Sequence, residues 1–465
     1  MKTVLISIFD SNMVRNILRT EVLRTIVADI SIDTVVLLVH PKKCVEYKKE
    51  FETEKVQVVP YDTTPATKLE QFFWFLLRNS IHTKNVRTKI DELLFTSSGN
   101  FSTRLIKHIA ARIIFSATKV SFVDMFLRRL TIHVHNEVEW LKVLEKYSPN
   151  LVFLPTIFGN RDIQLLKACR STTTPTLGMI KSWDNLIGKD PLLIWPDRLV
   201  VHNEIVKQYA ISMHSYPEER IFISGLPQLD VYVTNNRIRT RDQFLSSLGI
   251  DPKALLIVYS AVGKLISYHE PEVIQYLSEL IGSGGVVKDA HLLVRLHPAY
   301  PSDEGLLKEL PNTTIIRPGR VGVDDNPLRF DFEFDSEETT ALMETLKWAD
   351  VLIQSGSTMA IDAACFDTPI ISLGFDGYIE NEKLEFSNRR LLIKDHYQRI
   401  LDTGGTKEVY TEKELISAIQ EYIRHPEADK AGRARIVDEQ CYRLDGKSGR
   451  RVGEYILTYL QQISA

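Results

Sequence analysis

The chain has 465 residues, of which 44% are hydrophobic and 25% are charged, and its formal net charge is −3. The length predicts two or three domains, the composition is ordinary for a globular protein, and the slightly acidic balance argues against a nucleic-acid partner. Four widely separated cysteines form no CxxC or Cys/His cluster, which argues against a zinc site or a disulfide framework. We therefore expect a cytoplasmic protein without a metal or cofactor.

The first 60 residues alternate between apolar runs and amphipathic or charged segments. Strands are predicted at residues 4–9, 34–40 and 56–60, and helices at residues 14–28 and 42–54. This alternation is typical of a parallel, doubly wound sheet. Ligands of such sheets bind beyond the carboxyl ends of the strands, so Asp10 and Asn12 are candidate substrate-binding residues. The alternative interpretation of Asp10 is a helix cap.

Residues 69–132 are predicted to be mostly helical and contain aromatic and basic patches. Residues 123–129 place apolar side chains beside Arg128 and Arg129. Such a helix could lie on the inner face of an anionic membrane or grip a lipid-linked acceptor. A packed helix with snorkelling arginines is the alternative. No run of about 18 apolar residues predicts a transmembrane helix, and residues 4–9 are interpreted as a strand rather than a signal peptide.

Further strands are predicted at residues 151–155, 175–180, 198–202 and 220–225. Residues 234–241 then form a polar, charged segment, and this change of composition is typical of a domain boundary. We therefore predict an acceptor domain at residues 1–235 and a nucleotide-donor domain at residues 236–445. A C-terminal helix at residues 446–465 is expected to pack back on the first domain.

The second domain repeats the pattern of strand, small-residue loop and helix. Strands are predicted at residues 255–260, 291–296, 313–317, 351–353 and 370–373, with a short edge strand at 391–393. Gly263 and Lys264 follow the first of these strands, and Arg295 and His297 lie at the end of the second. Asp324 and Asp325 lie in an acidic insertion that we interpret as a solvated loop rather than a metal site.

Residues 349–377 predict a strand, a turn, a helix and a second strand. The turn is Ser355-Gly356-Ser357-Thr358, whose small residues and backbone N–H groups at a helix N-terminus favour a phosphate. Asp362 lies one helical turn after Thr358 and could accept hydrogen bonds from ribose hydroxyls. The alternative is an ordinary βαβ unit with a well-capped helix.

The three loops of the second domain should lie at the same edge of one parallel sheet. They would bring two cations, an imidazole and a helix N-terminus together, which suits a nucleoside diphosphate whose charge must be neutralised as it leaves. A strand-end arginine in a salt bridge with a histidine cap is the alternative for Arg295 and His297.

These features resemble the GT-B glycosyltransferases, whose fold is α/β with two doubly wound Rossmann-like domains facing a cleft. The resemblance is sharpest over residues 182–230 and 295–374. It extends to surface-polysaccharide transferases, CDP-glycerol glycerophosphotransferases and UDP-N-acetylglucosamine 2-epimerases. It implies that the diphosphate lies on residues 355–358, near Arg295 and His297, and the ribose on Asp362. The family usually has a glutamate at that last position.

The resemblance also bears on the reaction. The glycerophosphotransferases carry a His-Gly pair in a first-domain loop, where this chain has Trp183 and Asp184. This difference argues against glycerophosphate transfer and makes Asp184 a candidate catalytic base, with a turn beside a buried tryptophan as the alternative. The resemblance thus implies a metal-independent glycosyltransferase that moves a sugar from a nucleotide-sugar donor to a glycan or lipid-linked acceptor in surface polysaccharide synthesis, with His297 at the catalytic centre. A CDP-glycerol-type transferase, a sugar-nucleotide epimerase and a non-catalytic binding module remain alternatives.

Overall fold

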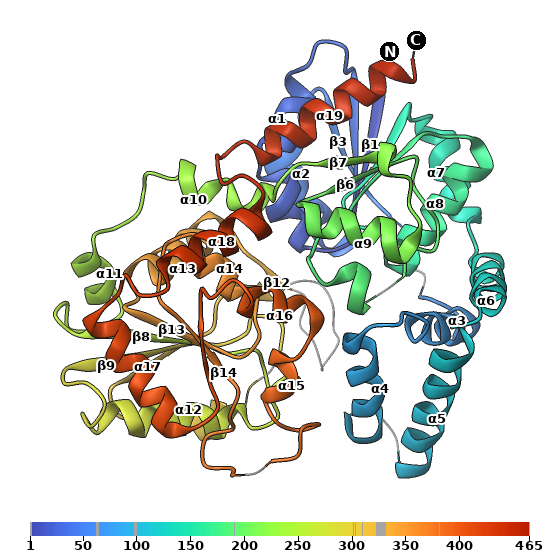
Figure 1. The fold of residues 1–465 in the computed structure, drawn as a ribbon. Coiled ribbons are helices and arrows are strands. Elements are labelled where there is room, and N and C mark those ends of the chain that lie inside the picture. The colour runs from blue at the N-terminus through green and yellow to red at the C-terminus, as the bar shows by residue number, and fades with distance from the viewer. Residues whose placement is uncertain are drawn as a thin grey trace. The chain divides into compact units, whose positions relative to one another are not determined.

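The computed structural model describes residues 2–61, 65–96, 100–189, 191–300, 302, 304–308, 310–321, 332–380 and 382–464. The chain divides into two compact units. The first comprises Met1–Asp230 and Tyr442–Ala465, and the second comprises Val231–Cys441. Each unit is an α/β body with its own sheet (Figure 1). Asp324 and Asp325 lie outside the described residues.

The first unit is built on a parallel sheet of seven strands, in the order β3-β2-β1-β4-β5-β6-β7. The strands are β1 Thr3–Ile8, β2 Thr34–Val39, β3 Val56–Pro60, β4 Leu151–Leu154, β5 Thr176–Met179, β6 Arg198–Val201 and β7 Ile221–Ile223. Strands β1, β4 and β5 are almost wholly buried, as expected for a parallel sheet that is covered on both faces. The strand order reverses between β1 and β4, which makes this the switch point of the sheet.

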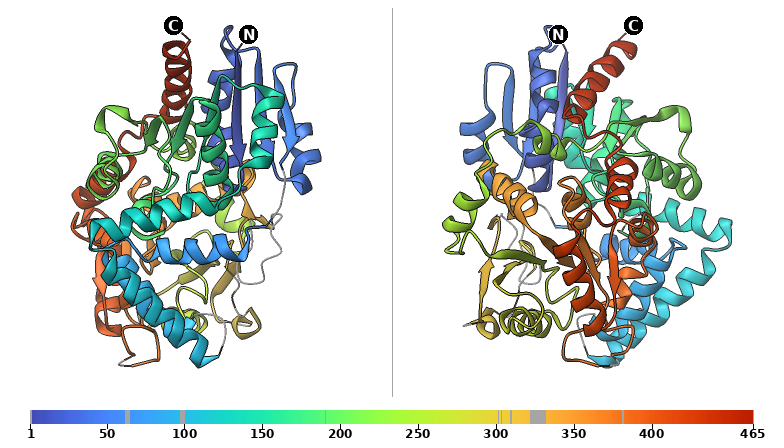
Figure 2. Two further views of the ribbon diagram at one scale, coloured as in Figure 1. Left: turned by 90° about the vertical axis from the view of Figure 1, so that its right-hand side faces the viewer. Right: turned by 60° about the vertical axis from the view of Figure 1, so that its left-hand side comes forward.

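Helices cover both faces of this sheet. They are α1 Glu21–Ala28, α2 Pro41–Phe51, α7 Val138–Tyr147, α8 Asn160–Thr172, α9 Glu204–His214 and the C-terminal α19 Ser448–Gln462. Helix α19 buries Val452, Ile456 and Leu460 in the same apolar cluster as Ile6. Asp230 fixes its first turn by accepting from the backbone N–H groups of residues 448 and 449, at 2.9 and 2.7 Å. The two chain ends therefore lie close together in the first unit (Figure 2).

A predicted helix over residues 14–28 is interrupted in the structure. A short π-helix, Val14–Leu18, follows the loop after β1, and α1 begins only at Glu21. Thr20 causes the interruption, because its hydroxyl accepts from the Val22 N–H as the N-cap of α1.

Four described helices lie between β3 and α7: α3 Lys68–Arg78, α4 Lys84–Thr96, α5 Phe101–Ala117 and α6 Ser121–Val134. They confirm the prediction of a mostly helical segment. Only a few of their side chains are fully buried, and α5 and α6 expose several large apolar residues. Within the described parts of the chain, no helix is long and apolar enough to cross a membrane.

The second unit has a parallel sheet of six strands, in the order β10-β9-β8-β13-β14-β15. They are β8 Leu255–Ser260, β9 Ala290–Arg295, β10 Thr313–Ile316, β13 Val351–Gln354, β14 Ile370–Leu373 and β15 Lys407–Val409. A separate antiparallel pair joins β11 Arg320–Val321 to β12 Phe332–Glu333. The switch point of the main sheet lies between β8 and β13. Two doubly wound sheets confirm the predicted fold class.

The helices of the second unit are α10 Val231–Thr234, α11 Arg241–Ser247, α12 Glu270–Gly282, α13 Ser336–Trp348, α14 Met359–Ala364, α15 Arg389–Leu392, α16 Asp395–Leu401, α17 Glu412–Arg424 and α18 Lys430–Cys441. The prediction of an edge strand at residues 391–393 is wrong, because Leu391 and Leu392 are buried side chains of α15. The edge strand is instead β15, a short strand that pairs with β14. Because it contains charged residues, its strand conformation depends on this pairing rather than on a local apolar pattern.

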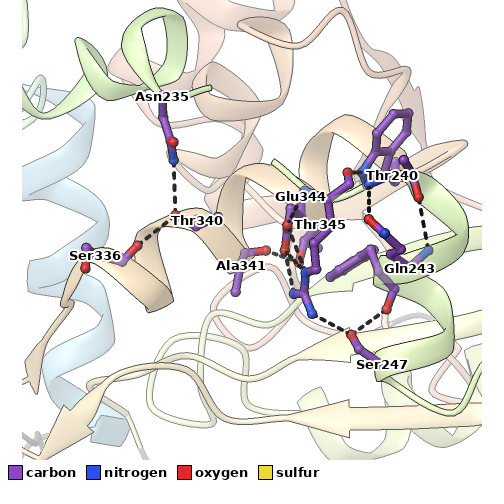
Figure 3. Close-up of polar contacts among 12 residues, drawn as sticks. Asn235, Thr240, Gln243, Ser247, Ser336, Thr340, Ala341, Glu344 and Thr345 are labelled. Atoms are coloured by element: carbon purple, nitrogen blue, oxygen red, sulfur yellow. Dashed lines mark hydrogen bonds and ion pairs between the residues drawn. The ribbon is translucent and has the colours of Figure 1, made fainter. Parts of the chain in front are cut away.

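A polar network anchors the start of this unit to α13 (Figure 3). Asn235 donates to the Thr340 hydroxyl at 3.1 Å. Arg239 donates from Nη2 to the Glu344 carboxylate at 2.6 Å, and only 1% of the Glu344 side chain is exposed. A capping box between Thr240 and Gln243 then starts α11. Residues 235–247 therefore form part of the packed second unit.

Candidate functional site

Three neighbouring strands bring the predicted donor-site loops to one edge of the second sheet. Ser260 of β8 is paired with Arg295 of β9 on one side and with Gln354 of β13 on the other. The loops that follow these strands hold residues 263–264, 297 and 355–358. They all leave from the carboxyl edge of the sheet, where β8 and β13 form the switch point.

The loop after β8 is fixed by Glu270, a wholly buried residue at the start of α12. Its carboxylate accepts from the Val262 N–H at 2.6 Å and from the Gly263 N–H at 2.9 Å. Gly263 has φ +88°, and a Cβ there would lie 2.3 Å from the Tyr300 Cβ. The Gly263 N–H is thus engaged within the protein, whereas the side chain of Lys264 is exposed at the edge of the sheet.

Burial raises the pKa of Glu270 to about 7, against the opposing effect of its hydrogen bonds from the backbone. Sequence reasoning missed this residue. A glutamate before a proline looks like the ordinary first turn of a helix, and only the tertiary structure shows that its side chain turns back to the loop.

Arg295 is a buried cation at the end of β9, with 4% of its surface exposed. Burial lowers its pKa to about 10, opposed by the nearby Glu338, Tyr232 and Asp362. It therefore keeps its charge at neutral pH. Its Nη2 is buried and has no hydrogen-bond partner among the residues that the structure describes. A charged donor in this state is a ready partner for an anionic ligand.

His297 lies in the loop that follows Arg295. Its Nδ1 accepts from the Ala299 N–H at 3.0 Å, so Nε2 carries the proton in the neutral ring. The ring packs against Tyr300 with a centroid distance of 4.7 Å, and Arg317 donates to the His297 carbonyl at 3.1 Å. These contacts hold the imidazole in a fixed orientation.

The turn after β13 is a tight, internally bonded structure. Gly356 has φ +66°, and a Cβ there would lie 2.8 Å from the Leu391 Cβ, so only glycine fits. The Ser357 N–H donates to the Gln354 side chain at 2.7 Å. Ser355 is buried, and Thr358 is exposed at the start of α14. The sequence supplies helix formers over residues 359–366, but α14 has only six residues and ends at Ala364.

Asp362 projects from α14 and is fixed by Tyr232 of α10, whose hydroxyl donates to its Oδ1 at 2.8 Å. It also lies within electrostatic range of Arg295. The carboxylate predicted to meet a ribose is therefore part of a Tyr232–Asp362–Arg295 group at the same edge. Tyr232 was not singled out from the sequence, because it lies in the stretch that leads into the predicted domain boundary.

The first unit holds the remaining predicted residues. Asp10 accepts from the backbone and the side chain of Asn12, at 3.0 and 3.1 Å, and forms an ion pair with Lys181. Asp184 accepts from the Ser182 hydroxyl at 2.8 Å and follows Trp183, which is 8% exposed. The predicted residues thus form two groups, one on each sheet.

No group of three or more His, Cys, Asp or Glu side chains suited to a metal ion occurs in the described segments. The two closest cysteines, Cys365 and Cys441, are free thiols with their sulfur atoms 3.8 Å apart.

Comparisons with known proteins place these observations in context. A sequence model of the family described as CDP-Glycerol:Poly(glycerophosphate) glycerophosphotransferase matches residues 189–458, which is 270 of the 465 residues. The match includes every predicted donor-site residue and begins just after Trp183 and Asp184. No curated protein matches the sequence.

Solved structures with a similar fold include UDP-N-acetylglucosamine 2-epimerases. The putative enzyme from Listeria monocytogenes has a TM-score of 0.56 at 10% identity, covering 99% of this chain and 98% of that one. The enzyme from Neisseria meningitidis bound to UDP-GlcNAc has a TM-score of 0.55 at 13% identity, covering 98% and 100%. The enzyme from Methanocaldococcus jannaschii has a TM-score of 0.54 at 15% identity, covering 99% and 100%. At this identity the similarity concerns the fold alone, which is of the GT-B type.

Proposed function

The chain belongs to the CDP-glycerol:poly(glycerophosphate) glycerophosphotransferase family, and from this premise we propose that it transfers glycerol phosphate from a CDP-linked donor to a polymeric acceptor at the cell surface. The observation that carries the proposal is the buried Arg295 on the sheet edge that the family match covers, since its Nη2 has no hydrogen-bond partner in the described part of the chain. A diphosphate supplies the anionic acceptor atoms that this donor lacks.

Each residue of the proposed donor site has a role in the transfer. Arg295 and Lys264 neutralise the diphosphate, and the turn at residues 355–358 approaches its oxygens. His297 donates from Nε2 to a phosphate oxygen, which stabilises the charge that develops on the leaving group. Asp362, held by Tyr232, orients Arg295 and can accept from a ribose hydroxyl. We assign charge neutralisation to these side chains rather than to a metal ion.

Sugar transfer is the second candidate, and one observation favours it. Trp183 and Asp184 stand where the glycerophosphotransferases carry a His-Gly pair, and both lie outside the matched residues. A nucleotide-sugar donor would use the same diphosphate contacts. The likeness to epimerases concerns the fold and does not favour epimerisation over transfer.

The product nucleotide distinguishes the candidates. Phosphotransfer from CDP-glycerol breaks the bond between the two phosphorus groups and releases CMP, whereas sugar transfer breaks the sugar–oxygen bond and releases a nucleoside diphosphate. We expect the purified chain to release CMP from CDP-glycerol in the presence of an oligo(glycerophosphate) acceptor, as measured by chromatography. Release of UDP from a UDP-sugar, with CDP-glycerol untouched, would replace the proposal by sugar transfer. Interconversion of UDP-sugars without release of nucleotide would establish an epimerase.

We also propose that α5 and α6 bind an anionic membrane surface. Residues 101–135 contain six basic residues and one acidic residue, Asp124, which pairs with Arg128 at 2.6 Å. The exposed apolar side chains include Phe122 and Ile106, which are 68% and 67% exposed. Apolar groups beside an excess of cations suit the interface of an anionic bilayer.

Vesicle flotation tests this membrane contact. The wild type should float with vesicles that contain 30% phosphatidylglycerol, because both apolar burial and charge attraction favour binding. The double variant Phe122→Ser/Phe126→Ser should lose most of this binding. The control Leu306→Ser removes an apolar residue of similar exposure from the second unit and should float like the wild type. Equal flotation of the double variant and the wild type would refute the contact.

A further inference from the structure

A pair of thiols joins two helices of the second unit. Cys365 is the residue that follows α14, and Cys441 is the last residue of α18. The two cysteines are 76 residues apart in the sequence, so no local motif predicts that they meet. Their sulfur atoms lie 3.8 Å apart, and both thiols are free. The two side chains are therefore close enough to react with each other after a small rearrangement.

Ion pairs hold the opposite end of α18 to the same turn. Arg433 donates from Nε to the Asp367 carboxylate at 2.8 Å, and Lys430 pairs with that carboxylate at 2.9 Å. Cys441 follows Arg433 by eight residues, which is about 12 Å along the helix axis. The first turn of α18 is thus anchored by charge, whereas its last residue meets Cys365 only through the contact between the two thiols. A bond between the two sulfur atoms would fasten this second end.

The two thiols differ in their access to solvent. Cys365 is partly exposed, whereas 1% of the surface of Cys441 is exposed. A small oxidant therefore reaches Cys365 first, and Cys441 lies in the position of a resolving thiol, which attacks the sulfur of an oxidised neighbour. The remaining cysteines, Cys44 and Cys169, are both buried in the first unit.

We propose that Cys365 and Cys441 are a redox modification site, at which a low-molecular-weight disulfide such as oxidised glutathione introduces a reversible disulfide bond between α14 and α18. The Cys365 thiolate attacks one sulfur of the oxidant, whose S–S bond breaks, and one glutathione leaves with the electron pair. The Cys441 sulfur then attacks the Cys365 sulfur and displaces the second glutathione. The protein loses two electrons and two protons, and the oxidant takes them up as two thiols.

The surroundings of Cys365 set the rate of this reaction. The contact with the Cys441 thiol, followed by burial and the charge of Asp362, raises the pKa of Cys365 well above its ordinary value. Because the thiolate is the attacking form, oxidation should be slow at neutral pH and should accelerate about tenfold for each unit of pH above 7. The site therefore responds to sustained oxidation rather than to a brief pulse of oxidant.

The disulfide would stabilise the second unit. It links two residues that are 76 positions apart, so it restricts the unfolded chain strongly and should raise the unfolding temperature of this unit by about 5 °C or more. It would also fix the helix that carries Asp362, which lies three residues before Cys365. This inference concerns the second unit alone and does not depend on the proposed function.

Peptide mapping of the wild type tests the proposal without any substitution. The folded chain is incubated with oxidised glutathione, its remaining thiols are blocked, and its peptides are analysed by mass spectrometry without reduction. We expect a peptide pair joined through Cys365 and Cys441, a higher unfolding temperature, and a return of both to the starting state with dithiothreitol. A cross-link that forms only in urea, or an unchanged unfolding temperature in the cross-linked protein, would overturn the proposal.

Two variants test the order of the steps. Cys441→Ala removes the resolving thiol, so glutathione should remain attached to Cys365 and the unfolding temperature should not rise on oxidation. The control Cys169→Ala removes a fully buried thiol of the first unit and should form the cross-link at the wild-type rate. Absence of the glutathione adduct from Cys441→Ala would show that Cys365 is not the residue that the oxidant reaches. If Cys441→Ala fails to fold, the mapping of the wild type still decides whether the disulfide forms.

Discussion

Replacing Arg295 with methionine should weaken the binding of CDP about 100-fold. Methionine keeps much of the aliphatic volume of the buried side chain but removes its charge and its donors. The loss corresponds to one or two charge-assisted hydrogen bonds to the diphosphate, made from a site where bulk water cannot substitute for the ligand. Isothermal titration calorimetry of both proteins with CDP measures the effect directly.

A matched control for this variant is Arg433→Met. Arg433 is also fully buried in the second unit, but its donors are satisfied by Asp367 at 2.8 Å and by the carbonyls of residues 426 and 428. Asp367 follows the C-terminal end of α14, away from the predicted phosphate turn. This variant should lose stability and keep its affinity for CDP. Wild-type affinity in Arg295→Met would remove Arg295 from the donor site.

Replacing Glu270 with alanine should destabilise the second unit by about 3 kcal/mol. The substitution leaves the N–H groups of Val262 and Gly263 buried without their acceptor and opens a cavity under the loop. The loop that carries Lys264 loses its main anchor, so the affinity for CDP should fall as well. Urea unfolding gives the free energy, and an unfolding midpoint equal to that of the wild type would contradict this account.

The conservative variant Glu270→Gln isolates the contribution of the Glu270 charge to the pH dependence of stability. The folded-state pKa of Glu270 is raised to about 7 from an ordinary value of 4.5, so its stabilising contribution is complete below pH 4.5. That contribution declines as the pH rises to 7, because the folded state holds its proton more tightly than the unfolded state. The free energy of unfolding of the wild type should therefore fall by roughly 3 kcal/mol relative to Glu270→Gln between pH 4.5 and 7. An unchanged difference across this range would show that Glu270 does not titrate in the folded protein.

Much of the architecture could be predicted because most of the strands are short, largely apolar runs that alternate with amphipathic segments. The strand predicted at residues 351–353 is confirmed as β13, and the helical prediction for residues 69–132 is confirmed by α3 to α6. The wrong prediction at residues 391–393 and the correct ones rest on the same signal, a short apolar run. A short apolar run fits a buried strand and a buried helix equally well, and in the structure Leu391 of α15 packs against Gly356.

For the candidate site, the sequence predicts only which residues lie at the ends of the strands. Parallel topology dictates that residues after β8, β9 and β13 share one edge, so the position of Arg295 followed from the sequence. The hydrogen-bond partners of these residues could not be predicted from the sequence. Glu270 occupies a first-turn helix position that sequence patterns assign to a solvent-exposed cap. Its burial depends on loops and helices that pack over it, which no local pattern records.

Amide hydrogen exchange of the wild-type chain, with and without saturating CDP, tests the donor-site assignment most directly. CDP should slow exchange in residues 261–268, 296–300 and 355–362, the segments that leave the carboxyl edge of the second sheet at β8, β9 and β13. Residues 101–134 of α5 and α6 should exchange equally in both samples. Unchanged exchange in those three segments, or protection confined to the first unit, would contradict the central claim that this edge binds the nucleotide of the donor.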